Sequence, residues 1–595
     1  MAVQPDEKLE NVLNLALDVP AGERERSLDL SVGYDPQANT WDLIVRYTGD
    51  IKRLASESVR ITELLAGYAV VTMPEPLIEE FSRQPEIQFV EKPKGLTFAV
   101  SVGRSVSCIN PLQSNVRPTR GAAAGTGTDS LFGSGVVIAV IDSGVDYWLE
   151  DFRDAEGKTR ILYLWDQTAE GTPPEGYQIG AEYSREQINE AITTGDRSLV
   201  PSRDFQNHGT PVAGIAAGGG GLGGIRYRGV APESELIVVK LGSRGGGFPR
   251  TVELMEAVDY AVRKMLAQGF PMVINLSFGN TYGSHEGNSL LETYLNDISN
   301  LGKLSICVGS GNEGGSGGHV SGVLSNLTEG ADREAGSTFI RLTVGQYETG
   351  LNLQIWKQYV DDFAIRLVTP RGQRLGPFSR AQPVSRFSAD GSEIFVYYGE
   401  PIPYSTAQEI YLDFIPADTY LESGIYLIQL TPLHIVDGRF DMWLPSEDVL
   451  NRATRFGSPT PDISLTIPSA AADVITVGAY DSRYLTYADF SGRGFTRVTN
   501  QVKPDLAAPG VAVETVQAGG GYGPVTGTSF ATPFVSGGAA LLMEWGIVRG
   551  NDPYLYGEKL KAYLRKGARP LPGFTQYPNP QVGYGALCVR NSLPV

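Results

Sequence analysis

The chain has 595 residues, of which 42% are hydrophobic and 19% are charged. This balance excludes wholesale disorder, and the length exceeds that of one ordinary domain. Its 67 acidic residues outnumber the 49 basic ones, and the net charge of -18 argues against a general nucleic-acid binder.

Residues 1–100 are expected to form a small α+β propeptide-like domain. Its start is polar and acidic, so we expect no secretory signal peptide and synthesis in the cytoplasm. Asp50–Leu65 is compatible with a helix, and Pro74 is expected to open a helix over Glu75–Gln84. Three apolar segments predict strands: Trp41–Tyr47, Tyr68–Met73 and Ile87–Val90.

Residues 101–134 are rich in Gly, Ser, Arg and Ala and are expected to form a linker. Residues 135–320 then alternate between apolar runs and helical stretches such as Thr251–Ala267. Unbroken apolar runs are typical of strands that are covered on both faces, as in a parallel sheet. The pattern predicts a doubly wound α/β layer, whose strands include Val136–Ile141, Leu236–Val239, Val273–Leu276 and Leu304–Val308.

Residues 321–460 change in character, and residues 461–595 return to the α/β style, with an expected helix over Ser529–Trp545. Short segments rich in Ile, Phe, Tyr and Val, separated by Gly, Pro and Asp, predict an inserted all-β sandwich. The expected strands are Thr338–Val344, Leu351–Lys357, Phe363–Thr369, Glu393–Tyr398, Glu409–Ile415, Gly424–Leu430 and Phe440–Leu444.

Three segments carry residue types that can perform chemistry. They are Asp142 in VIDSG, His208 in HGTPVAG and Ser529 in GTSFATP. Taken singly, each favours a structural interpretation: an aspartate in a turn, an isolated histidine and a serine N-cap. Taken together, their Asp–His–Ser order is the order of the subtilisin triad.

These segments resemble the three signatures of subtilisin-like serine proteases. A fourth segment, VGSGNEG, resembles the one that carries the oxyanion-hole asparagine, here Asn312. The resemblance covers about residues 135–320 and 460–590. It implies that His208 removes the proton of the Ser529 nucleophile, Asp142 orients the imidazole, and Asn312 binds the oxyanion.

The resemblance also suggests a substrate cleft. Ser277, Phe278 and Gly279 are similar to one edge that pairs with substrate backbone, and Gly242 and Ser243 are similar to the facing edge. Asp151 stands where many subtilisins place a calcium ligand. Its partner loop, residues 218–223, has no carboxylate or amide side chain, so we expect no metal there and no cofactor.

The insertion at 154–206 and the β unit at 321–460, expected to be a jelly roll, resemble the architecture of Csp-type clostridial spore proteases. That resemblance implies a propeptide that acts as an intramolecular inhibitor, with autocleavage within Thr97–Cys108. It further implies activation of a cortex-lytic zymogen during germination, in a protein incorporated into the spore. The partners would be protein or peptide substrates, without nucleic acid or membrane.

Two other readings remain open: a propeptide-blocked binding or signalling pseudoprotease, and a general housekeeping subtilase. The cysteines Cys108, Cys307 and Cys588 are too few for a disulfide framework. We therefore expect a reducing compartment and purely structural cysteines.

Overall fold

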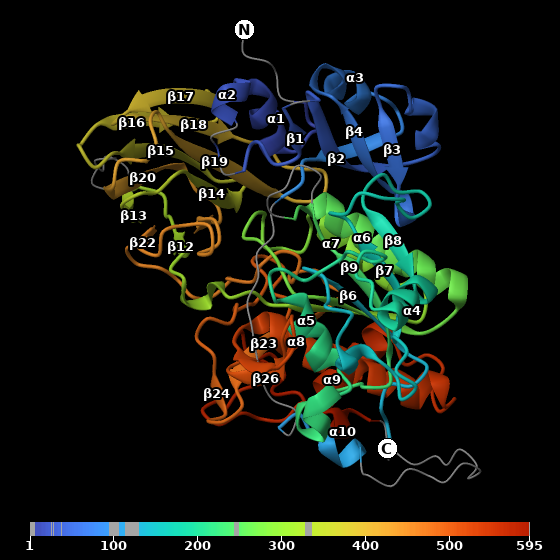
Figure 1. The fold of residues 1–595 in the computed structure, drawn as a ribbon. Helices are drawn as coiled ribbons and strands as arrows, with labels where there is room; N and C mark the ends of the chain where they lie inside the picture. Colours follow the sequence, from blue (N-terminus) through green and yellow to red (C-terminus); the bar gives the residue numbers. More distant parts are fainter. Residues whose placement is uncertain are drawn as a thin grey trace. The chain divides into compact units, whose positions relative to one another are not determined.

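The fold was analysed in a computed structural model that describes residues 6–24, 27, 29–36, 38–94, 106–113, 130–242, 249–327 and 336–593. The chain forms two compact units from discontinuous segments (Figure 1). One, here called the α/β unit, comprises residues 96–279, 291–312 and 468–595. The other, the β-rich unit, comprises residues 1–95, 280–290 and 313–467.

The α/β unit is built on one nine-stranded sheet, in the order β24-β23-β11-β10-β6-β9-β7-β8, with β25 beside β23. The pairs from β25 through β6 to β7 are parallel, whereas the edge strands β8 and β24 are antiparallel. The predicted doubly wound sheet is thus confirmed. Its strands are β6 (Val137–Asp142), β7 (Ile161–Asp166), β8 (Ala181–Ser184), β9 (Glu235–Lys240), β10 (Met272–Leu276), β11 (Leu304–Gly309), β23 (Ile475–Asp481), β24 (Thr486–Tyr487) and β25 (Leu506–Pro509).

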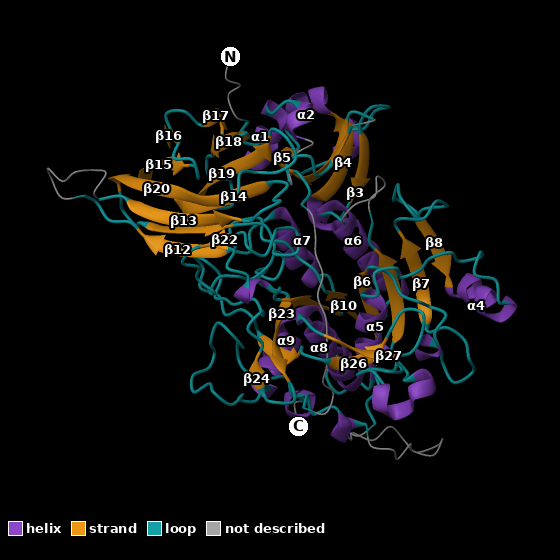
Figure 2. Ribbon diagram, turned by 60° about the vertical axis from the view of Figure 1, so that its left-hand side comes forward, coloured by secondary structure: helices purple, strands orange, loops and turns teal. Residues whose placement is uncertain are grey.

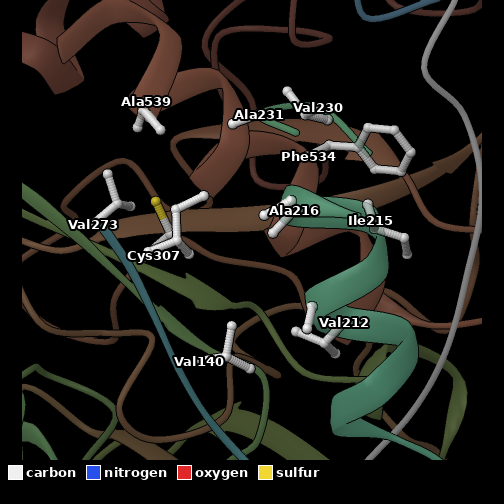
Figure 3. Close-up of a cluster of buried hydrophobic side chains, with 14 of the residues drawn as sticks. Val140, Val212, Ile215, Ala216, Val230, Ala231, Val273, Cys307, Phe534 and Ala539 are labelled. Atoms are coloured by element: carbon white, nitrogen blue, oxygen red, sulfur yellow. The ribbon is translucent and has the colours of Figure 1, made fainter. Parts of the chain in front are cut away.

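Apolar helices pack on this sheet because its central strands are apolar on both faces. α8 packs against β10, β11 and β23 as well as against α5. Figure 3 shows part of this core, with Phe534 of α8 close to Ile215 of α5 and to Val230. The helices are α4 (Arg185–Thr194), α5 (Gly209–Ala217), α6 (Thr251–Gln268), α7 (Leu290–Ser299), α8 (Thr528–Met543), α9 (Gly557–Gly567) and α10 (Val589–Ser592); a small hairpin pairs β26 (Val513–Val516) with β27 (Tyr522–Val525).

The segment Thr528–Val548, which joins α8 to a π-helical turn, is long and apolar enough to cross a membrane. However, 89% of its apolar window is buried inside the protein. It is therefore the core helix of the α/β unit. The predicted helix over Ser529–Trp545 corresponds to this segment.

The chain reverses its direction of winding around β6. β9 lies on one side of β6 and β10 on the other, and α6 connects them. In open α/β sheets, functional groups gather outside the carboxyl ends of strands at such a switch point. The carboxyl end of β6 is Asp142. The insertion at 154–206 supplies β7, β8 and α4, which extend the sheet beyond β9 (Figure 2).

The β-rich unit contains two antiparallel sheets that share one apolar core, in the orders β12-β21-β14-β19-β18-β17 and β16-β15-β20-β13-β22. All of the predicted strands are present. The prediction missed β12, β16, β17 and β22, whose sequences lack continuous apolar runs. The strands are β12 (His319–Val323), β13 (Thr338–Val344), β14 (Leu351–Gln358), β15 (Asp362–Val368), β16 (Arg374–Phe378), β17 (Val384–Ala389), β18 (Ser392–Tyr398), β19 (Ala407–Pro416), β20 (Gly424–His434), β21 (Arg439–Trp443) and β22 (Arg455–Phe456). We call this part the two-sheet insertion.

The N-terminal part of the β-rich unit has a five-stranded antiparallel sheet, β1-β2-β4-β3, with β5 on β2. Asp50–Leu65, although compatible with a helix, does not form one. Asp50 instead caps a short 3-10 turn, and Arg60–Glu63 pairs with β4, because edge pairing outweighs weak helix propensity. The elements are α1 (Asn11–Asp18), α2 (Ala21–Arg24), α3 (Ile78–Ser82), β1 (Tyr34–Asp35), β2 (Thr40–Tyr47), β3 (Arg60–Glu63), β4 (Tyr68–Pro74) and β5 (Ile87–Glu91).

A disulfide joins Cys108 to Cys588 within the α/β unit. The cysteine count did not predict this bridge, and two of the three cysteines therefore have more than a packing role. The segment around Cys108 is also held by noncovalent contacts. Ser107 accepts a hydrogen bond from the Val589 backbone N–H (3.0 Å), and Leu112 is buried in the core. The disulfide thus fixes the end of the expected processing region to the C-terminal part of the chain.

Candidate active site

Asp142 ends β6 with its side chain fully buried. Its Oδ1 accepts a hydrogen bond from the Ser143 backbone N–H (2.7 Å) and lies 2.6 Å from Nδ1 of His208. With Nδ1 facing a carboxylate, the neutral imidazole carries its proton on Nδ1 and leaves Nε2 as the basic atom. The pair therefore combines an oriented imidazole with a carboxylate that stabilises its charged form.

His208 immediately precedes α5, whose first turn is anchored to the loop after β6. The Asp204 carboxylate accepts hydrogen bonds from Ser143 Oγ (2.8 Å) and from the Thr210 backbone N–H (2.8 Å). Ser143 Oγ in turn accepts from the Gly209 N–H (2.9 Å). An acidic group at a helix N-terminus satisfies unpaired donors and is favoured by the helix dipole. Asp204 and Ser143 thus position His208, and sequence reasoning missed both of them.

Gly209 explains why the motif reads His-Gly. A Cβ on Gly209 would lie 2.1 Å from the Gly144 carbonyl oxygen and 3.0 Å from Cβ of Asp142. No larger residue fits without moving the helix from the carboxylate. The preceding Asn207 has a φ of 55°, which asparagine tolerates better than most residues. The chain is therefore in a left-handed conformation just before His208 and packs closely against the loop after β6 just behind it.

Ser529 lies in the first turn of α8 and exchanges two hydrogen bonds with the segment after β10. Its Oγ donates to the Ser277 carbonyl (2.7 Å), and Ser277 Oγ donates to the Ser529 carbonyl (2.8 Å). The Ser529 carbonyl can accept this bond because Pro533, four residues on in α8, has no N–H to offer it. These bonds fix Ser529 to one predicted edge of the cleft.

Two polar side chains extend this network beneath Ser277. Asn275 Nδ2 donates to Ser277 Oγ (2.7 Å), and Asn275 Oδ1 accepts from Ser536 Oγ in α8 (2.8 Å). All three side chains are buried. The chain of bonds joins β10 to α8 at two positions. Asn275 is a further positioning residue that the sequence motifs did not reveal.

Asn312 follows β11 and is oriented by the residue before Ser529. Its Oδ1 accepts from the Thr528 backbone N–H (3.1 Å) and from Thr528 Oγ1 (3.3 Å). With Oδ1 engaged in this way, the NH₂ group is the part of the amide that can donate to another group. A donor of this kind, held at the start of the helix that carries Ser529, suits the stabilisation of developing negative charge.

The expected cleft residues follow the carboxyl ends of β9 and β10. Phe278 is buried and Ser277 bonds to Ser529 as described, whereas Gly279 ends the segment. On the facing side, a Cβ on Gly242 would lie 2.0 Å from Cγ2 of Thr168. Ser243 lies outside the described residues, as does most of the expected processing region Thr97–Cys108.

Asp151, the residue at the expected calcium position, is bonded to a tyrosine. The Tyr522 hydroxyl lies 3.2 Å from both carboxylate oxygens, and burial raises the pKa of Asp151. Among the described residues, no group of three or more His, Cys, Asp and Glu side chains could hold a metal ion. His285 and His319 stack on Trp443, with ring centroids 4.1 and 4.6 Å away; they are structural residues of the β-rich unit.

Comparison with known proteins identifies the family. Residues 133–415 and 458–585 match the family model of the subtilases, and residues 7–94 match the Csp protease B prodomain. The minor extracellular protease Vpr of Bacillus subtilis (strain 168) is 24% identical over 494 residues, which cover 78% of this chain and 52% of Vpr. The PI-type proteinase of Lactococcus lactis subsp. cremoris is 25% identical over 474 residues, or 72% of this chain and 23% of that protein. The chain thus spans about half of Vpr and less than a quarter of the PI-type proteinase.

Among solved structures, the CspB protease of Clostridium perfringens is similar, with a TM-score of 0.70 and 36% sequence identity. The similarity covers 78% of this chain and 93% of the CspB chain. The match to the subtilase model extends over more than half of the sequence and includes Asp142, His208, Asn312 and Ser529. The chain belongs to the subtilase family and carries an N-terminal prodomain of the Csp protease B type.

Proposed function

We propose that the protein is a serine endopeptidase in which Asp142, His208 and Ser529 form the catalytic triad. The observation that carries this proposal is the 2.6 Å contact between His208 Nδ1 and Asp142 Oδ1 at the switch point of the sheet. A serine hydroxyl is a poor nucleophile unless a base removes its proton. An imidazole with Nε2 basic, held in place by Asp142, meets that requirement.

In the proposed mechanism, the Ser529 hydroxyl rotates from the Ser277 carbonyl towards His208 and attacks the carbonyl carbon of the scissile bond. His208 Nε2 takes the hydroxyl proton and later gives it to the leaving amine, while Asp142 stabilises the imidazolium. The oxyanion accepts hydrogen bonds from the Ser529 N–H and the Asn312 amide. A water molecule then attacks the acyl-enzyme in the same way and releases the acyl group. The net reaction is the hydrolysis of one peptide bond to a carboxylic acid and an amine.

The segments Ser277–Gly279 and Gly242–Ser243 are proposed to bind extended substrate between them. We further propose that the enzyme cleaves its own chain within Thr97–Cys108 and that the prodomain inhibits it. We also propose that the enzyme activates a cortex-lytic zymogen of spores. The two-sheet insertion is proposed to have a jelly-roll topology. These proposals are supported by the prodomain match and by the similarity to CspB.

Intact mass and N-terminal sequencing of the purified chain test the proposal directly. We expect wild type to be cut within or near Thr97–Cys108 and Ser529→Ala to remain whole. Ser299→Ala, which removes another buried hydroxyl of the same unit, is expected to be processed like wild type. An uncut wild type with the mass of Ser529→Ala would overturn self-maturation and favour the binding or signalling alternative.

A further inference from the structure

The prodomain packs on the outer face of the two-sheet insertion inside the β-rich unit. Figures 1 and 2 show α1 beside the strands β18 and β19, and α1 contacts β18 directly. The shared apolar cluster includes Val12 and Leu15 of α1 together with Phe395 and Tyr411 of the insertion. Asn11 also donates to the Glu400 carbonyl (3.1 Å). Burying this apolar face favours the docked prodomain.

Buried acidic groups from both partners meet in this contact. Glu409 and Asp413 lie four residues apart on β19, so their side chains lie on the same face of the strand. Glu409 is 5% exposed and Asp413 is fully buried. The charged groups that surround them come from the prodomain: Glu10, Asp29, Glu91, Lys92 and Lys94. The tyrosines Tyr282, Tyr397 and Tyr411 complete the titratable groups around this pair.

The two lysines are already engaged by prodomain carboxylates. Lys92 Nζ lies 3.0 Å from Asp29, and Lys94 Nζ lies 2.9 Å from Glu10 and 2.7 Å from Glu91. If all five carboxyl groups were ionised, the cluster would carry five negative and two positive charges, an excess of three. A buried charge without a counterion costs several kcal/mol.

Within the described part of the chain, the ion pairs of Lys92 and Lys94 are with prodomain carboxylates and not with Glu409 or Asp413. Among the described residues, neither oxygen of Asp413 forms a hydrogen bond of ordinary geometry, and the nearby Ser27 hydroxyl and Phe414 N–H offset only part of the effect of burial on its pKa. Glu409 lines a cavity of about 40 Å³, shared with Glu10, Glu91 and Lys94. That space holds a few water molecules at most and cannot hydrate an ionised carboxylate as bulk water does. The geometry therefore favours the neutral form of both groups.

The pKa values of Glu409 and Asp413 agree with this geometry. Burial, and then the nearby Glu10, raise the pKa of Glu409 to about 8. Burial, and then Asp29, raise the pKa of Asp413 to about 7. A carboxyl group exposed by undocking returns to its ordinary pKa near 4. Docking therefore takes up protons, and its stability falls as pH rises from about 4 to about 8 and levels off above that.

We propose that this cluster is a pH-dependent latch, in which the prodomain is held on the two-sheet insertion while Glu409 and Asp413 are protonated and is loosened when they ionise. The latch acts on the docking of the prodomain and does not require the catalytic residues. Coupled to the proposed inhibition, it would weaken that inhibition as the medium changes from mildly acidic to neutral.

Hydrogen exchange followed by mass spectrometry on the full chain tests the latch without any activity measurement. The peptide that covers α1 reports undocking, and the peptide that covers β20 serves as an internal reference. We expect the protection of α1, corrected for intrinsic exchange, to fall at least tenfold from pH 5.5 to pH 7.5, because each group contributes up to about tenfold per pH unit.

In the double variant Glu409→Gln/Asp413→Asn, whose side chains are neutral at every pH, we expect less than a threefold change. Asp418→Asn, which alters an exposed aspartate after β19, should behave like wild type. If the double variant does not fold, each single variant should show about half of the logarithmic slope. A wild type with pH-independent α1 protection, or folded variants with the wild-type slope, would overturn the latch. Neither result would depend on whether Ser529 is the nucleophile.

Discussion

Asp142 Oδ1 and His208 Nδ1 lie 2.6 Å apart, and neither residue is more than 4% exposed. Asp142→Asn would keep the shape of this pair but remove the charge that fixes the tautomer and stabilises the imidazolium. We expect kcat to fall by about 10⁴-fold with little change in KM. Peptide hydrolysis measured with the mature enzyme checks this, with the exposed turn residue Asp154→Asn as control. A loss below tenfold would contradict the role of Asp142.

Asn312 is oriented by Thr528, directly before the proposed nucleophile. Asn312→Ala removes one oxyanion donor, and we expect kcat to fall by about 10²–10³-fold while KM changes little. Asn300→Ala, an exposed asparagine of the same unit, should retain full activity. An Asn312→Ala enzyme in which KM rises and kcat is unchanged would instead assign the amide to substrate binding.

The disulfide between Cys108 and Cys588 joins two residues whose sequence separation is 480. Such a cross-link restricts the unfolded chain, so its removal is expected to lower the free energy of unfolding of the α/β unit by about 2–5 kcal/mol. Thermal unfolding of wild type with and without dithiothreitol measures this effect. Cys108→Ser/Cys588→Ser should unfold at the lower temperature and be insensitive to the reductant. Equal melting temperatures for oxidised wild type and the variant would contradict the prediction.

Cys307 of β11 is the remaining cysteine, and Figure 3 shows its sulfur among the apolar side chains of the core. Burial raises the pKa of this thiol to about 12. The reactive thiolate is therefore scarce and inaccessible at pH 8. Thiol titration should find no reactive cysteine in the native protein and one in the denatured, unreduced protein. Three thiols after denaturation would show that the bridge is absent.

The parts of the fold with a strong local pattern could be predicted from the sequence. Apolar runs such as Val136–Ile141 predict buried parallel strands, and the short alternating segments predict most strands of the insertion. Of the motif residues, Asp142 lies at the carboxyl end of β6 and Asn312 follows β11, whereas His208 and Ser529 lie at the starts of α5 and α8. These features depend on residues that are close in the sequence.

Features that depend on distant residues could not be predicted. Arg60–Glu63 forms a strand only because β4 lies beside it. Asp204 positions His208 through contacts that only the folded loop creates. The same holds for the disulfide, whose cysteines give no spacing signal, and for the buried pair Glu409 and Asp413. Polar and apolar residues alternate along β19 as they do on a strand with one exposed face. Docking of the prodomain buries the face that carries Glu409 and Asp413.

The central claim is that Ser529 is the nucleophile, and active-site labelling tests it most directly. The mature protein would be treated with a fluorophosphonate, digested and mapped by mass spectrometry. We expect one label per chain, on Ser529, lost in His208→Ala and retained at a reduced rate in Asn312→Ala. Labelling of another residue, or none in a chain that has removed its prodomain, would contradict the assignment.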